Sequence, residues 1–309
     1  MNARSLSAAT ADNSPKRISG FDWPLASFFA LAYAIAWSTF PVMAYFARQA
    51  GVADAVTLMG LAEAMDFESI EGSLPVPSWA LYLTTRIADF SFTIAGLVVV
   101  AWISGRPGLS ALLRRLIHFK VPIRWYLFAT IPFVFYGISA LLFIFSNDEI
   151  GFDPVLSADT LRTILFSAEA GIIVVLLLRG PMGEELGLRG FALTRLQERY
   201  SPTRASLVIG VLWAGWHLPV LLGRDPVSIG LYCILVILLS FIFTWLYNGS
   251  GGSLVPVLLF HTFQNAEDVF EVALPGLFGT DWETVSSLAL LATGLVVCVL
   301  IVRSGRRAL

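Results

Sequence analysis

GIIVVLLLRGPMGEELGLRGF, residues 171–191, places two adjacent glutamates and an arginine directly after a run of apolar residues. The chain around this stretch has the same character, because 57% of its 309 residues are hydrophobic and only 14% are charged. Soluble domains are about 25% charged. The composition therefore indicates a membrane protein, and ionisable groups at the end of an apolar segment in such a protein are candidates for function.

Eight stretches each supply about the 20 mostly apolar residues that a transmembrane helix requires. We therefore expect an all-α, polytopic bundle of about eight transmembrane helices. The expected spans are 25–47, 79–103, 125–145, 161–178, 205–222, 227–247, 253–270 and 284–302. Residues 1–20 are polar and predict a disordered cytoplasmic tail, and residues 21–309 predict a single transmembrane domain.

The arginines and lysines predict the orientation of these spans. Segment 104–124 contains five basic residues and no acidic one, whereas 48–78, 148–159 and 267–283 are acidic. Because basic loops stay in the cytoplasm, both termini are expected there, in a bacterial cytoplasmic membrane. The stretch 107–120 is amphipathic and is expected to lie along the inner membrane surface, so His118 receives no catalytic role.

The two glutamates are expected to differ in role. Glu185 and Arg189 lie four residues apart on a helix, with the acid first, which is the favourable order for an ion pair. Glu184 lies about 100° further round the helix axis. One carboxylate is then held by the arginine, and the other is free to act as a general base. The alternative is that all three are ordinary surface charges at a cytoplasmic helix end.

Two histidines lie in later predicted spans. His217 lies in WAGWHLP, residues 213–219, and His261 lies four residues before Asn265 in HTFQN, so His261 and Asn265 share a helix face. A lone histidine in a membrane helix is often a packing or hydrogen-bonding residue. Two histidines with an asparagine and a glutamate pair supply more: a base for water, a group that orients it, and donors for an oxyanion.

Other polar residues within the predicted spans receive structural interpretations. Arg86 and Asp89 lie three residues apart in the second span and are interpreted as a structural ion pair. Cys233 and Cys298 both lie in apolar runs and are interpreted as buried apolar residues. A structural role is favoured over a functional one for Arg86 and Asp89, and packing is the favoured role of the two cysteines.

At these residues the chain resembles the CPBP intramembrane protease family, which includes CAAX prenyl endopeptidases and bacteriocin-processing or immunity proteins. The family pattern is Glu-Glu-x-x-x-Arg, then aromatic-x-x-x-His, then His-x-x-x-Asn/Asp. This sequence matches it at Glu184, Glu185 and Arg189, at Trp213 and His217, and at His261 and Asn265. The resemblance implies an endopeptidase in which Glu184 activates water, His217 helps to hold it, and His261 and Asn265 form the oxyanion site. It implies that Glu185 and Arg189 are a supporting pair, and that the helical bundle encloses an intramembrane catalytic cavity.

The resemblance implies a site without a cofactor or metal. Two histidines and a glutamate could bind zinc, but the sequence contains no His-Glu-x-x-His motif and Asn265 is a poor zinc ligand. Zinc remains the less favoured alternative. For Glu184 to meet the histidines, the fourth helix must bend near Gly180 and Pro181 and carry the glutamate inward, or water must reach deep between the helices.

The expected partners are the lipid bilayer and a membrane-associated peptide or protein, which the resemblance suggests is prenylated, and no nucleic acid is expected. One alternative is a non-proteolytic membrane protein of the same fold, such as an immunity factor or a regulatory scaffold. Another is a transporter with an acidic-histidine proton relay. The intact motif set favours the enzyme, and the absence of matching broken helices in two halves disfavours the transporter.

Overall fold

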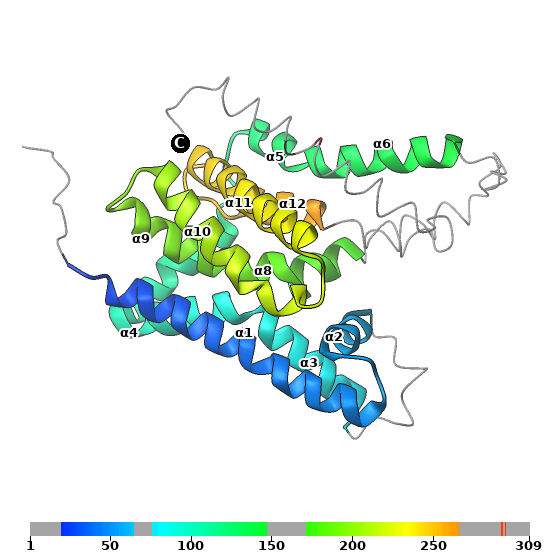
Figure 1. The fold of residues 1–309 in the computed structure, drawn as a ribbon. Helices are drawn as coiled ribbons and strands as arrows, with labels where there is room; N and C mark the ends of the chain where they lie inside the picture. Colours follow the sequence, from blue (N-terminus) through cyan, green and yellow to red (C-terminus); the bar gives the residue numbers. More distant parts are fainter. Residues whose placement is uncertain (1–19, 65–75, 147–170, 266–291, 293, 295–309) are drawn as a thin grey trace, which may run out of the picture.

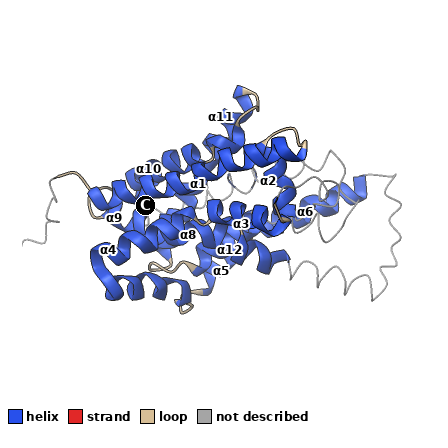
Figure 2. Cartoon of the chain, turned by 90° about the horizontal axis from the view of Figure 1, so that it is seen from below, coloured by secondary structure: helices blue, strands red, loops and turns tan. Residues whose placement is uncertain are grey.

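A computed structural model describes residues 20–64, 76–146, 171–265, 292 and 294 of the chain. Within these residues the regular structure is helical and contains no strand (Figure 2). The α-helices are α1 (Trp23–Ala50), α2 (Ala55–Ala64), α3 (Ser78–Asp89), α4 (Ser91–Arg114), α5 (Ile123–Ala129), α6 (Ile131–Ser146), α8 (Gly180–Glu185), α9 (Thr194–Gln197), α10 (Pro202–Trp216), α11 (Pro226–Gly249) and α12 (Val255–Gln264). There are also a π-helix, η4 (Leu186–Leu193), and two 3₁₀-helices, η2 (Arg115–Ile117) and η5 (Leu218–Leu221). Residues 171–178, before the bend at Arg179, are helical as well.

Three of the described helical segments are long and apolar enough to cross a membrane: Trp23–Ala50, Ser91–Ile117 and Pro226–Gly249. They correspond to the first, second and sixth predicted spans. Several of their large apolar side chains are exposed, including Trp37, Trp102 and Leu231, as expected for helices that face lipid. The tail at 1–20, most of the fourth span and nearly all of the eighth lie outside the described residues, as does Cys298. Cys233 is free and packs, partly buried, against the core.

Three spans predicted as single helices are interrupted. The second is divided at Phe90, where the backbone (φ −84°, ψ 6°) leaves the helical region between α3 and α4. The third is divided at Thr130, just before Pro132 in the first turn of α6. The fifth ends at Trp216, because Pro219 has no amide hydrogen and its ring clashes with a continuing helix.

The helix α4 changes direction at Gly105. Its backbone there (φ 58°, ψ −153°) lies outside the helical region, in the left-handed half of the map that glycine adopts without a steric penalty. Two helical segments meet at this residue, and the second runs from there to Arg114. Most of this second segment falls within the stretch 107–120 that the sequence predicts to lie along the membrane surface.

The glutamate-bearing helix lies in the middle of the described bundle. The segments α8 and η4 contact α4 on one side and α12, α10 and α11 on the other (Figure 1). Glycine allows the closest of these contacts, because a Cβ atom on Gly187 would overlap the backbone carbonyl of Phe92 in α4. Similarly, a Cβ atom on Gly183 would overlap the carbonyl of Asp89. The break between α3 and α4 therefore lies directly against α8.

Candidate active site

The chain turns at Arg179, immediately before the two glutamates. Arg179 is extended (φ −111°, ψ −163°), and α8 begins at Gly180 with Pro181 in its first turn, where the missing amide hydrogen costs no helical hydrogen bond. The bend predicted near Gly180 and Pro181 is present, one residue earlier. Glu184 is 5% exposed, and Glu185 and Arg189 are 0% exposed. The alternative that these are ordinary surface charges is therefore wrong.

The side chain of Glu184 is held by Trp213. The indole Nε1–H of Trp213 donates a short hydrogen bond to Oε2 of Glu184. The other carboxylate oxygen lies beside Gly180, because a Cβ atom on that glycine would be 2.6 Å from Oε1 of Glu184. Sequence reasoning placed Trp213 only in the family motif and did not identify it as the partner of Glu184.

The second glutamate joins two helices. Oε1 of Glu185 lies 3.1 Å from Nη1 of Arg189 and 2.8 Å from Nδ1 of His261. The pair with Arg189 was predicted from the α-helical spacing of four residues. It forms even though the helix changes from α to π at Leu186, between the two residues. The contact with His261 was not predicted, because it joins α8 to α12.

Aromatic rings surround the buried guanidinium of Arg189. Its Cζ atom lies 4.7 Å from the ring centroid of Trp213 and 4.7 Å from that of Phe243. A cation over an aromatic face is attracted by the ring quadrupole, most strongly where water is excluded. Nε and Nη2 of Arg189 have no hydrogen-bond partner among the described residues. The rings therefore provide much of the environment that stabilises this charge.

His217 caps the C-terminal end of α10. Its Nδ1 atom lies 2.9 Å from the carbonyl oxygen of Trp213, four residues earlier. A carbonyl can only accept a hydrogen bond, so Nδ1 carries the hydrogen. In the neutral ring Nε2 is then left as an acceptor. The ring packs edge-on against Trp216 and Tyr232, with centroid distances of 4.7 and 5.3 Å.

His261 and Asn265 lie at the end of α12. His261 is buried within the helix, and Asn265 is the residue that ends it, with its amide hydrogen donated to the carbonyl of His261 at 3.0 Å. The prediction that both side chains project from one helix face holds only in part, since Asn265 already lies past the last helical residue. Asn265 is half-buried.

One cavity of about 550 Å³ connects three of these residues. Glu184, His217 and Asn265 line it, together with residues of α1, α3 and α11. His261 does not line the cavity. Its Nε2 atom instead lies beside Gly180, because a Cβ atom on Gly180 would be 3.5 Å from Nε2. The protease hypothesis requires the Glu184 carboxylate and both imidazoles to face one shared cavity. Glu184 and His217 meet this requirement, whereas His261 lies outside the cavity lining.

The predicted ion pair in the second span is present, with Nη1 of Arg86 3.0 Å from Oδ2 of Asp89. Arg86 also donates a short hydrogen bond to the carbonyl of Leu178. Asp89 additionally lines the cavity, which the purely structural interpretation did not include. The sequence feature that could have indicated a role for Asp89 in the cavity is that Arg86 and Asp89 are the only charged residues within 79–103.

Within the described part of the chain, no group of three or more histidine, cysteine, aspartate or glutamate residues is arranged to hold a metal ion. The two histidines each use Nδ1 for a protein contact, with Glu185 and with the Trp213 carbonyl. A chelation experiment is needed to decide between the zinc alternative and a metal-free site.

Comparisons with known proteins point to the same region. Residues 166–266 match the family model described as type II CAAX prenyl endopeptidase Rce1-like. The chain is also 33% identical over 110 residues to a protein named CAAX prenyl protease 2 from Methanococcus maripaludis. That alignment covers 32% of this chain and 41% of the relative, so the chain spans less than half the length of the curated relative it matches. The family resemblance read from the motifs is confirmed for this region, and the apolar helices make the chain an integral membrane protein.

Proposed function

We propose, because residues 166–266 match the Rce1-like family model, that this protein is an intramembrane endopeptidase in which Glu184 activates water. The observation that carries this proposal is the shared cavity. The buried carboxylate of Glu184, the ring of His217 and Asn265 all line it. Peptide hydrolysis needs a base, an oriented water and oxyanion donors. Glu184, His217 and Asn265 line the cavity and can supply the base, the group that orients water and one oxyanion donor. His261, whose Nε2 atom lies beside Gly180, is the proposed second donor.

In the proposed first step, water lies between Glu184 and His217. Nε2 of the neutral His217 ring accepts one water hydrogen, and the free oxygen of the Glu184 carboxylate takes the proton as the water oxygen attacks the scissile carbonyl. The hydrogen bond from Trp213 orients the carboxylate. Holding reacting groups in such a geometry supplies a large part of the rate enhancement of many enzymes.

In the proposed oxyanion site, His261 and Asn265 donate to the carbonyl oxygen as it gains negative charge. Nδ1 of His261 faces the Glu185 carboxylate at 2.8 Å, so Nε2 can donate only when the ring is the imidazolium. Glu184 then gives its proton to the amide nitrogen, the carbon–nitrogen bond breaks, and a carboxylic acid and an amine result.

The proposed substrate is a membrane-associated protein or peptide, cut near a tail that a lipid group holds at the bilayer. The relative from Methanococcus maripaludis is named as a CAAX prenyl protease. We propose the same substrate class, a prenylated CAAX protein, for this chain. The orientation that we propose has both termini in the cytoplasm, because the arginine-rich segments then face that side.

The test is cleavage of a fluorogenic, farnesylated C-terminal peptide by purified protein in detergent or proteoliposomes. Wild type is expected to cut it, and Glu184→Gln and His261→Ala are expected to lose about 10²–10⁴-fold in rate. Glu198→Gln is a matched control, because Glu198 is exposed and lies outside the cavity. An unprenylated peptide of the same sequence tests the lipid requirement.

The non-proteolytic alternative predicts the opposite result in the same assay. An immunity factor or scaffold of this fold would leave every peptide intact, and Glu184→Gln would then behave like wild type. Equal cutting by wild type, Glu184→Gln and His261→Ala would also contradict the proposal, because the cleavage would come from a contaminant.

A further inference from the structure

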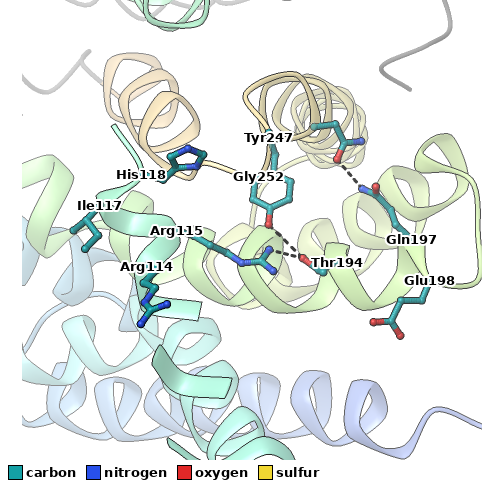
Figure 3. Close-up of a pocket in the computed structure, with 11 residues that line it drawn as sticks. Arg114, Arg115, Ile117, His118, Thr194, Gln197, Glu198, Tyr247 and Gly252 are labelled. Carbon is teal, nitrogen blue, oxygen red and sulfur yellow. Dashed lines mark hydrogen bonds between the residues drawn. The ribbon is translucent and has the colours of Figure 1, made fainter. Parts of the chain in front are cut away.

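A second pocket, of about 870 Å³, lies at the opposite end of α11 from the catalytic cavity. It is bordered by 114–118 at the end of α4, by α9, and by the turn 248–252 after α11 (Figure 3). We call it the basic pocket, after Arg114 and Arg115. It shares no lining residue with the cavity that contains Glu184. The proposed catalytic chemistry therefore does not explain it.

The side chain of Arg115 is fixed in this pocket. Its Nη1 atom donates to Oγ1 of Thr194 at 2.8 Å, and its guanidinium carbon lies 5.7 Å from the ring centroid of Tyr247. The hydroxyls of Thr194 and Tyr247 are 3.3 Å apart (Figure 3). The backbone carbonyl of Arg115 also accepts from the amide of Leu254 at 3.0 Å. The guanidinium is thus held in place by neutral groups.

Within the described part of the chain, neither Arg114 nor Arg115 forms an ion pair with an acidic side chain. Glu198 is the one acidic residue that borders the pocket. The surrounding segment 104–124 adds three further basic residues and no acid. An excess of positive charge beside a cavity attracts an anion, and guanidinium groups recognise phosphate oxygens through paired hydrogen bonds.

Exposed apolar side chains place the pocket at the membrane boundary. Ile117 is 66% exposed and Phe119 is 60% exposed, and Leu113 is also exposed beside Arg114. These residues follow the change of direction of α4 at Gly105, where the membrane-crossing part of the helix gives way to the predicted surface segment. Apolar residues among basic ones are typical of a segment that lies among lipid headgroups.

We propose that the basic pocket binds the headgroup phosphate of an anionic phospholipid of the inner leaflet. A lipid fits better than a free anion, because Ile117 lines the pocket and is largely exposed, and it offers an apolar surface to the glycerol and upper acyl chains next to the arginines. Basic pockets on the cytoplasmic side of membrane helices are known to bind such headgroups.

The experiment measures lipid binding to the full-length protein by native mass spectrometry in detergent. Phosphatidylglycerol is titrated against phosphatidylcholine for wild type, Arg114→Gln, Arg115→Gln and the double variant. Wild type is expected to retain phosphatidylglycerol preferentially, and each lost arginine is expected to weaken this binding about fivefold. Arg106→Gln is the matched control, because Arg106 is exposed on the same segment and lies outside the pocket.

Three outcomes would overturn the proposal: unchanged phosphatidylglycerol binding in the double variant, an equal loss in Arg106→Gln, or equal binding of phosphatidylcholine by wild type. In a separate measurement, inorganic phosphate is added to the lipid-bound protein. Displacement of the lipid by phosphate at equal concentration would identify a free-anion site instead. If Arg115→Gln lowers the unfolding temperature, lipid binding is compared in Arg114→Gln and in Arg115→Lys instead. Arg115→Lys keeps the positive charge. Because the readout is binding, the result does not depend on whether the protein is a protease.

Discussion

Glu185 and His261 are joined by a contact of 2.8 Å between Oε1 and Nδ1, although they lie 76 residues apart in the chain. The same carboxylate oxygen lies 3.1 Å from Nη1 of Arg189. One buried acid therefore orients an imidazole on α12 and pairs with a guanidinium on its own helical segment. This arrangement lets Glu185 act on the proposed oxyanion site without itself lining the cavity.

Removal of Arg189 should destabilise the protein as well as reduce its activity. Arg189→Met leaves the Glu185 carboxylate buried without its cation, and breaking a buried pair in this way costs about 3–5 kcal/mol. Chemical unfolding in detergent micelles, followed by tryptophan fluorescence, measures the loss. Arg204→Met, at an exposed arginine of α10, is the control and should unfold like wild type.

The double variant Glu185→Leu, Arg189→Met separates the two effects. Replacing both members of a buried pair by apolar residues is often neutral for stability, so much of the lost stability should return. Activity should not return, because His261 has lost the carboxylate that orients it. Recovery of full activity in the double variant would contradict the positioning role of Glu185.

Gly180→Ala should reduce activity while leaving the fold intact. The added methyl group would lie 2.6 Å from Oε1 of Glu184 and 3.5 Å from Nε2 of His261, so the carboxylate must move. A displacement of about 1 Å in a catalytic group can cost about 10²-fold in rate. Cleavage rates and unfolding are compared with Gly230→Ala in α11, where a new Cβ atom meets nothing within 4 Å. A rate equal to wild type would show that Glu184 tolerates the shift.

Gly187→Ala should act on stability. A Cβ atom there would overlap the carbonyl oxygen of Phe92, so η4 and α4 would have to separate. Overpacking of this kind typically costs about 1–3 kcal/mol. Gly137→Ala, in an open position on α6, is expected instead to stabilise its helix by up to about 1 kcal/mol. Unchanged unfolding of Gly187→Ala would show that the contact between these helices is looser than the structure indicates.

Chelation should leave cleavage unaffected. The proposed chemistry uses a carboxylate and two imidazoles, and the Nδ1 atoms of both imidazoles are engaged by Glu185 and by a backbone carbonyl. The measurement is the peptide-cleavage rate before and after treatment with 1,10-phenanthroline. Loss of activity that added zinc restores would support the metal-dependent alternative, since Nε2 of each ring is the nitrogen that a zinc ion would use.

Local features of the site could be predicted from the sequence because they depend on the geometry of a single helix. The spacing of Glu185 and Arg189 places them on one face, and the structure has that pair. The ion pair of Arg86 and Asp89 follows the same rule. The early end of the fifth span could also be predicted from Pro219, but the mostly apolar character of 205–222 favoured one continuous helix.

By itself, the sequence determined the helical membrane class, the local pairs and the set of motif residues, because apolar length and helical periodicity act within one segment. Only the tertiary structure decided that Trp213 holds Glu184, that Glu185 reaches His261 and that Asp89 lines the cavity. Periodicity says how side chains are arranged around one helix axis, but not how far that helix is rotated or shifted against its neighbours. That relation is set by close packing, here through the glycines of the glutamate-bearing segment against α3 and α4.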